Sequence, residues 1–404
     1  MNIPTNVSFI LQTLEAAGYE AFIVGGCVRD IICGVVPKDW DIATSATPDR
    51  AKPLFRRTID TGVKHGTITV LIDKQTYEVT TYRIDGEYLD NRRPETVTFT
   101  GNIEDDLARR DFTINAIAYN PARGFVDPFG GREDIARKMI RCVGEPAHRF
   151  QEDALRMLRA IRFAGTTGFS ICSKTLEAIA ELAPNLQNIS PERIREELGK
   201  LITSPNPQAA EFLYTTGLMP YIVPAPSGPD VNPRLCEWLT SCPPREPMRM
   251  ALFLHWAGEN CENTLRALRF DNGSIKEISL YVQMLHTPPP QNRYEIKKLL
   301  RFIPQELFEN LLTLQALIDP SKTEALHTTR LEAADIIQKG ECYTLRNLAV
   351  NGEILAQAGI SRGKTMGDIL ERLLDTVMQN PEMNTADILM RQDIIRTSTS
   401  HKNS

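Results

Sequence analysis

Two aspartates, Asp39 and Asp41, stand one residue apart in the segment Lys38-Asp39-Trp40-Asp41. On an extended strand, where side chains alternate between faces, both carboxylates would lie on the same face. They would repel each other unless a cation lay between them, and such oxygen ligands suit Mg²⁺, which also takes phosphate oxygens. We therefore predict that Asp39 and Asp41 are catalytic Mg²⁺ ligands for phosphoryl transfer. A solvated loop is the alternative for an isolated Asp-x-Asp.

A pair of glycines precedes these aspartates, at the end of the apolar run Ala21-Phe22-Ile23-Val24. Gly25 and Gly26 between a strand and a helix would let the backbone approach a phosphate closely. Arg29 could donate charge-assisted hydrogen bonds to the same phosphate. A Gly-Gly turn between a strand and a helix is, however, often only a matter of chain geometry. Glycines for a triphosphate, followed by aspartates for metal ions, together predict a nucleotidyltransferase.

A third segment, residues 152–163, has the apolar spacing of an amphipathic helix. On it, Asp153 and Arg156 would be neighbours one turn apart, followed by Arg159 and Arg162. They could form an ion pair on a solvated face. They could instead recognise a base, because a carboxylate accepts from the amine of cytosine or adenine while a guanidinium donates to the adjacent ring nitrogen. Uracil and guanine would leave the carboxylate unpaired, which is costly.

Seven ordered segments together resemble the class II tRNA nucleotidyltransferases of bacteria, a family that includes bacterial poly(A) polymerases. They are residues 25–30, 39–47, 65–70 with 77–83, 92–94, 105–116, 127–131 and 149–163. The chain resembles the short form of the family, since His255 lacks the following aspartate of the phosphohydrolase domain found in longer relatives.

The resemblance implies that the helix with Asp153 and Arg156 acts as a protein template for CTP and ATP. The implied nucleotide-binding residues are Gly25, Gly26, Arg29, Arg110, Asp153, Arg156, Arg159 and Arg162. The implied reaction is template-independent addition of C and A to the 3′ end of tRNA, with release of pyrophosphate. Residues 85–94 match a loop associated with addition of the terminal A. An A-adding enzyme, a poly(A) polymerase and a noncatalytic RNA-binding module remain alternatives.

The hydrophobic pattern predicts an α+β fold: a head with a mixed β-sheet and helices, followed by an all-helical remainder. β-rich runs occur at residues 21–24, 67–72 and 77–82, whereas helical spacing dominates after residue 149. By resemblance, residues 189–198 belong to the neck. We expect a head (1–140), a neck with base-recognition helices (141–205), a body (206–290) and a tRNA-binding tail (291–404).

Composition limits the classes of partner. Lys and Arg total 46 against 51 Asp and Glu, so the net charge of −5 argues against coating nucleic acid by bulk charge but allows a local basic surface. No apolar run reaches transmembrane length, no secretory signal is visible, and the eight cysteines form no Cys-x-x-Cys pair. We expect a cytoplasmic enzyme that binds CTP, ATP and the tRNA 3′ end, with no membrane and no stable protein partner.

Overall fold

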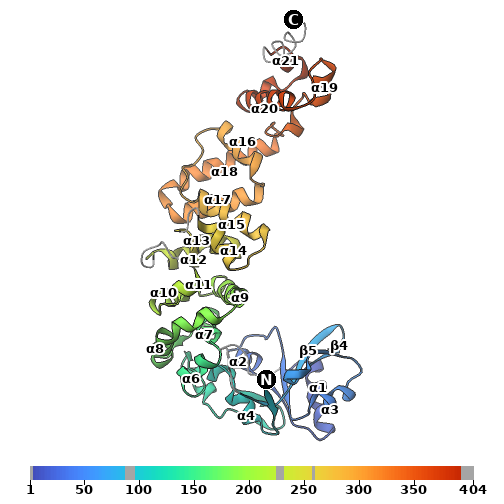
Figure 1. Cartoon of the computed structure of the whole chain (residues 1–404), viewed down its shortest axis with the longest axis vertical. Coiled ribbons are helices and arrows are strands. Elements are labelled where there is room, and N and C mark those ends of the chain that lie inside the picture. The colour runs from blue at the N-terminus through green and yellow to red at the C-terminus, as the bar shows by residue number, and fades with distance from the viewer. Residues whose placement is uncertain (1–2, 87–95, 224–231, 257–259, 393–404) are drawn as a thin grey trace. The chain divides into compact units, whose positions relative to one another are not determined.

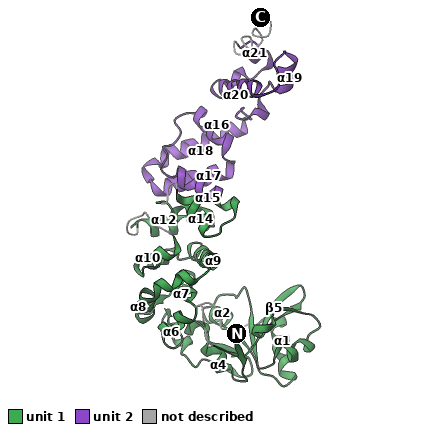
Figure 2. Ribbon diagram, in the orientation of Figure 1, with its two compact units in different colours: residues 1–275 green, residues 276–404 purple. Residues whose placement is uncertain are grey.

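The computed structural model describes residues 3–86, 96–223, 232–256 and 260–392. The chain divides into two compact units, residues 1–275 and residues 276–404 (Figure 2). The first unit contains every residue that the sequence predicts for the active site. Each unit is described by itself.

A seven-stranded sheet forms the head of the first unit (Figure 1). β2 and β5 pair in parallel and their other neighbours are antiparallel, so the sheet is mixed, as predicted. In spatial order the strands are β3 (Thr58–Gly62), β4 (Thr67–Ile72), β5 (Gln75–Thr81), β2 (Asp41–Thr44), β1 (Ala21–Val24), β8 (Ala118–Asn120) and β9 (Gly124–Val126).

The interior strand β1 explains why the glycines lie beside Asp41. All four of its side chains are buried, in agreement with its unbroken apolar sequence. Ile23 lies opposite Ile42 in antiparallel register with β2, so the end of β1 lies beside the start of β2. Gly25 therefore follows β1 at the same edge of the sheet at which Asp41 begins β2, and α2 (Gly26–Ile32) starts there.

The helix predicted over residues 152–163 is in fact two helices, α6 (Pro146–Glu152) and α7 (Leu155–Thr167). Between them Asp153 is extended, with φ −141° and ψ 103°. Its side chain accepts the backbone N–H of Leu155 at 3.0 Å. Aspartate competes in this way with helical hydrogen bonding and starts a new helix instead. The prediction that Asp153 and Arg156 are neighbours on one helix face is therefore wrong.

The rest of the first unit is mostly helical. A two-residue parallel ladder joins β10 (Met139–Ile140) to β11 (Ser170–Ile171), and β6 (Arg83–Asp85) pairs with β7 (Val97–Phe99). The further helices are α1 (Thr5–Ala16), α3 (Pro48–Ala51), α4 (Ile103–Ala108), α5 (Gly131–Ala136), α8 (Ser173–Leu182), α9 (Pro191–Ile202), α10 (Glu211–Thr215), α11 (Met219–Ile222), α12 (Leu235–Ser241), α13 (Glu246–Phe253) and α14 (Cys261–Ala267). The predicted fold class, a mixed-sheet head followed by helices, is confirmed.

The second unit consists of helices around their own core, which includes Leu355, Leu374 and Val377. α15 (Asn272–Met284) leads into it, and its helices are α16 (Arg293–Phe302), α17 (Gln305–Ile318), α18 (Thr323–Gln338), α19 (Gly352–Gln357), α20 (Lys364–Gln379) and α21 (Ala386–Met390). Among the helices of the described residues, none has both the length and the apolar character that crossing a membrane requires. All eight cysteines are free.

Candidate active site

All ten predicted site residues line one cavity of about 630 Å³ in the first unit. The head supplies six of them from strand ends, loops and the helix α2: Gly25, Gly26, Arg29, Asp39, Asp41 and Arg110. The segment at α7 supplies the other four: Asp153, Arg156, Arg159 and Arg162. Arg109 and Arg193 also line the cavity, so its arginines outnumber its carboxylates. Such a cavity favours a polyanion with several phosphate groups.

Gly25 makes room for one of these arginines. Its φ of +77° lies in the left-handed region that side chains rarely adopt. A Cβ on Gly25 would stand only 2.7 Å from Nη1 of Arg110, so the guanidinium lies directly against the glycine backbone. The other terminal nitrogen of Arg110 pairs with Asp106 at 3.1 Å. The glycine thus has two functions: it turns the chain from β1 into α2, and it admits Arg110 to the cavity.

Nearby carboxylate charges act on Asp41 and Glu78 at the start of β2. Desolvation raises the pKa of Asp41, and the charge of Asp39 raises it further, while Arg110 acts in the opposite direction. Glu78 lies opposite Asp41 on β5, and its pKa is also raised, by desolvation and then by the charges of Asp41 and Asp39. A bound cation would relieve this repulsion, so the residues present fit a divalent metal ion.

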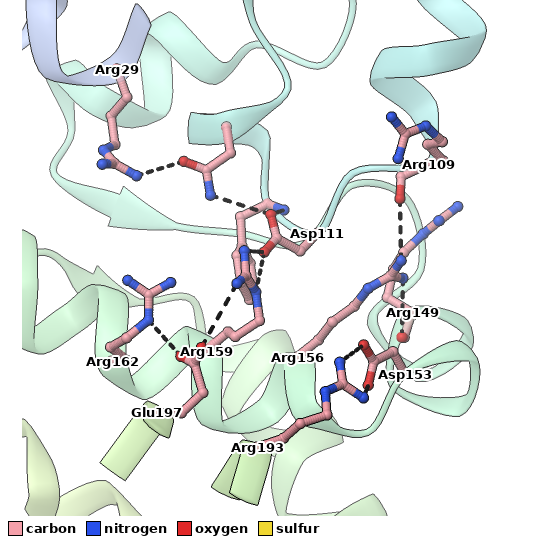
Figure 3. Close-up of polar contacts among 12 residues, drawn as sticks. Arg29, Arg109, Asp111, Arg149, Asp153, Arg156, Arg159, Arg162, Arg193 and Glu197 are labelled. Atoms are coloured by element: carbon pink, nitrogen blue, oxygen red, sulfur yellow. Dashed lines mark hydrogen bonds and ion pairs between the residues drawn. The ribbon is translucent and has the colours of Figure 1, made fainter. Parts of the chain in front are cut away.

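The other arginines are held in place by acidic and polar partners from distant segments (Figure 3). Arg29 donates to Oδ1 of Asn115 at 2.7 Å. Arg159 donates to Asp111 through Nε at 2.8 Å and Nη2 at 2.7 Å. Burial alone would raise the pKa of Asp111, but the charge and hydrogen bonds of Arg159 outweigh it and lower the pKa to about 2. The carboxylate therefore stays ionised and fixes Arg159 at the cavity wall.

An aromatic ring stabilises this cluster of positive charges. The guanidinium carbon of Arg162 lies 3.8 Å from the ring centroid of Phe163, and those of Arg29 and Arg159 lie 5.2 Å and 5.4 Å from it. Cations over an aromatic face are attracted by its quadrupole. Phe163 is buried, so it holds guanidinium groups from two elements close together without using a hydrogen bond.

Asp153 and Arg156 line the same cavity but have different ion-pair partners. Asp153 pairs with Arg193 of α9, with Oδ2 2.8 Å from Nη2. Arg156 pairs with Glu152 and donates to the backbone carbonyls of Arg149 and Arg109, at 3.2 Å each. Asp153 and Arg156 are thus held by other residues and not by each other. Both still line the cavity, where a base would bind.

Several of these partners were not predicted from the sequence: Glu78, Asp111, Glu152, Arg193 and Glu197. For Arg193 and Glu197 a signal exists, since their spacing of four in residues 189–198 places both on one helix face. For Asp111 no local pattern points to Arg159. The loop predicted at residues 85–94 falls almost entirely on residues 87–95, which lie outside the described residues.

Three family models match successive parts of the chain. The model of the "Poly A polymerase head domain" matches residues 21–141. Two further models match residues 168–227, described as "Probable RNA and SrmB- binding site of polymerase A", and residues 246–392, a tRNA nucleotidyltransferase domain 2. A CCA-adding enzyme of Geobacillus thermodenitrificans is 37% identical over 402 residues, covering 98% of this chain and 97% of the relative. The chain belongs to the family of CCA-adding enzymes. It is thus a nucleotidyltransferase of the predicted class.

Two further CCA-adding enzymes agree with this assignment. That of Limosilactobacillus reuteri is 36% identical over 404 residues, covering 95% of this chain and 94% of the relative. The crystal structure of the Bacillus stearothermophilus CCA-adding enzyme in complex with CTP superposes with a TM-score of 0.81 at 33% identity, covering 100% of both chains. The resemblance drawn from seven segments of the first 165 residues therefore extends over the whole chain.

Proposed function

We propose that this chain adds C and A to the 3′ end of tRNA from CTP and ATP, without a nucleic-acid template, and releases pyrophosphate. The observation that carries the proposal is the convergence of the ten predicted site residues on one arginine-lined cavity. The full-length similarity to CCA-adding enzymes supports the same reaction, and the structural relative solved with CTP supports that nucleotide as a substrate.

In this proposal the arginines bind the triphosphate. Arg29, Arg110, Arg159 and Arg162 present fixed guanidinium groups, because each is held by a carboxylate, an amide or an aromatic ring. Donors that are already oriented need no reorganisation when negative charge develops on the departing pyrophosphate. The backbone at Gly25 and Gly26 lets phosphate oxygens approach closely.

Asp153 and Arg156 select the base. Asp153 would accept the exocyclic amine of cytosine or adenine, and Arg156 would donate to the neighbouring ring nitrogen. UTP and GTP would place a carbonyl oxygen against the carboxylate of Asp153, so their binding would leave two acceptors facing each other without a proton.

Asp39 and Asp41 would hold Mg²⁺. When bound, Mg²⁺ would supply the positive charge that activates the attacking 3′-hydroxyl and stabilises the leaving phosphate oxygens. Among the described residues, no group of three or more His, Cys, Asp or Glu side chains is close enough to hold a metal by itself. Two carboxylates completed by substrate phosphates are the usual arrangement for Mg²⁺. Glu78 would then act through its charge alone.

The tRNA 3′ end would approach from a second cavity, of about 1210 Å³, which shares Asp39 and Asp41 with the first. Lys38, Lys138 and Lys200 line this second cavity, where positive charge suits an RNA backbone. In-line attack places the hydroxyl opposite the leaving pyrophosphate, so the two substrates need separate approaches to the same two carboxylates.

The helical remainder would bind the acceptor arm of the tRNA by recognising the shape and the backbone of the RNA, as is usual for double-helical RNA. We keep the division into head (1–140), neck (141–205), body (206–290) and tail (291–404) as part of the proposal. We also propose that the enzyme works in the cytoplasm and needs no stable protein partner.

The test uses three tRNA transcripts: one without the CCA end, one ending in CC and one with complete CCA, each with CTP, ATP or both. We expect C, C and then A on the first transcript, A on the second and nothing on the third. Incorporation of A without C would indicate an A-adding enzyme, and long A runs would indicate a poly(A) polymerase. Wild-type incorporation by Asp39→Ala would contradict the metal hypothesis, and no incorporation by the wild-type protein would favour a binding module.

A further inference from the structure

The helix α9 packs against α7, and two of its charged side chains form ion pairs with residues of the α7 segment. Arg193 and Glu197 are one turn apart on α9, so their side chains lie on the same face. Arg193 meets Asp153, and Glu197 meets Arg162 (Figure 3). One face of α9 thus contacts both the base-recognition end and the arginine end of the nucleotide cavity.

The contact between Arg193 and Asp153 orients a carboxylate without using all of its acceptor capacity. Oδ2 of Asp153 accepts from Nη2 of Arg193 at 2.8 Å, and Oδ1 lies 3.4 Å from Nη1. Oδ1 also accepts the Leu155 backbone N–H at 3.0 Å. A carboxylate has about four lone-pair sites, so Asp153 can still accept the amine of a base. Its direction is set by one backbone group and one guanidinium.

The contact between Glu197 and Arg162 serves another part of the cavity. Glu197 is 5% exposed, and Oε2 accepts from Nε of Arg162 at 2.5 Å. Oε1 lies 3.9 Å from a terminal nitrogen of Arg159. Glu197 thus holds arginines that the proposed function assigns to the triphosphate. Among the described residues, its ion pairs are with Arg159 and Arg162 and not with Arg156.

Building on the proposed function, we propose that Arg193 is a positioning residue for base selection. It acts through Asp153, which rejects UTP and GTP only while its carboxylate points at the base. Without Arg193, Asp153 keeps the hydrogen bond from the Leu155 N–H but loses the one from the guanidinium. Its carboxylate can then turn away from the carbonyl of a wrong base, so that base is tolerated. Glu197 is the corresponding positioning residue for Arg162, and it therefore governs nucleotide affinity rather than selection.

The experiment compares Arg193→Gln, Arg193→Lys and Glu197→Gln with a matched control, Arg195→Gln. Arg195 lies on the same helix but donates to the Arg269 carbonyl and lies against Phe270. For each protein, kcat and KM are measured with CTP, UTP, ATP and GTP on the transcripts described above. A thermal unfolding curve accompanies each set.

We expect Arg193→Gln to reduce the preference for CTP over UTP, and for ATP over GTP, by about tenfold, the cost of one charge-assisted hydrogen bond. Arg193→Lys should restore part of the preference, because lysine keeps the charge but not the fork. Glu197→Gln should raise KM for CTP and ATP alike, again about tenfold, with both preferences unchanged. The control should leave selection unchanged.

An Arg193→Gln protein that unfolds at the wild-type temperature and keeps wild-type preferences would overturn the inference. An equal loss of preference in Arg195→Gln would overturn it as well, since it would show a general loosening of α9. If Arg193→Gln does not fold, full wild-type preference in Arg193→Lys overturns the inference and a partial loss supports it. Failure of the proposed function looks different, because the wild-type protein itself would then add A without C, add long runs of A, or add nothing to the transcripts.

Discussion

Asp41 on β2 lies directly opposite Glu78 on the parallel strand β5. The pKa of each carboxyl is raised, in both cases first by desolvation, and Asp39 adds to the effect on both. The protein without bound metal therefore carries unfavourable negative charge at this edge of its sheet. A site that concentrates such charge binds cations well but makes the fold less stable, and the two effects can be measured separately.

The first prediction concerns Asp41→Asn. Because folding raises the pKa of Asp41, its ionised form is less favourable in the folded protein than in the unfolded chain, and this cost applies at pH values above the raised pKa. Asn removes the cost, so the metal-free variant should unfold at the wild-type temperature or above. Incorporation of C and A should fall by at least about a hundredfold, since Asp41 is one of the two proposed metal ligands.

Thermal unfolding in a chelator and incorporation assays with Mg²⁺ check this prediction. Asp49→Asn, at an exposed position in α3, is the control and should change neither quantity. A large drop in the unfolding temperature of Asp41→Asn would mean that Asp41 has a structural function.

The second prediction concerns Glu78→Gln. If Glu78 attracts the cation through its charge, the Gln variant should need about threefold to tenfold more Mg²⁺ for half-maximal activity, because an opposite charge nearby is lost. Activity should recover at high Mg²⁺ concentration. Titration of incorporation with Mg²⁺ measures this shift. Loss of activity at every Mg²⁺ concentration would instead show that Glu78 is an indispensable ligand.

The third prediction concerns Gly25→Ala. The new Cβ would lie 2.7 Å from Nη1 of Arg110 and would also force alanine into a φ of +77°. We expect a stability loss of about 1–3 kcal/mol and a higher KM for both CTP and ATP, because Arg110 must leave its position. Denaturant unfolding and steady-state kinetics test the two effects. Gly101→Ala, where the added Cβ meets no atom within 4 Å, should show neither effect.

The fourth prediction concerns Asp111→Asn and its dependence on pH. Since burial is outweighed by Arg159 and the pKa of Asp111 falls from 3.8 to about 2, ionised Asp111 stabilises the fold above pH 3.8. This contribution, about 2 kcal/mol at pH 7, is lost as the pH falls from 3.8 towards 2. Denaturant unfolding at pH 7 and pH 3 should therefore show a smaller difference between variant and wild type at pH 3. An equal difference at both values would contradict the ion-pair explanation.

Most of the residues that line the candidate active site could be predicted from the sequence because their spacing is local. Asp39 and Asp41 are one residue apart, although only Asp41 lies on β2 and Asp39 lies in a bend before it. Gly25 and Gly26 follow the preceding strand, and Arg29 comes three residues later. Alternation along a strand and the geometry of a tight turn depend on neighbouring residues alone, so these patterns predicted both the type of chemistry and the fold class that supports it.

The tertiary structure determined which side chains hold these groups in place. Asp111 meets Arg159, and Arg193 meets Asp153, across contacts between elements that no local pattern pairs. Periodicity indicates which face of a helix is apolar, but it does not say which other element packs there. Periodicity also missed the break at Asp153, whose side chain accepts a hydrogen bond from the Leu155 N–H and interrupts the helix. The sequence alone thus determined the candidate reacting groups and their order along the chain, whereas packing between distant elements determined their orientation.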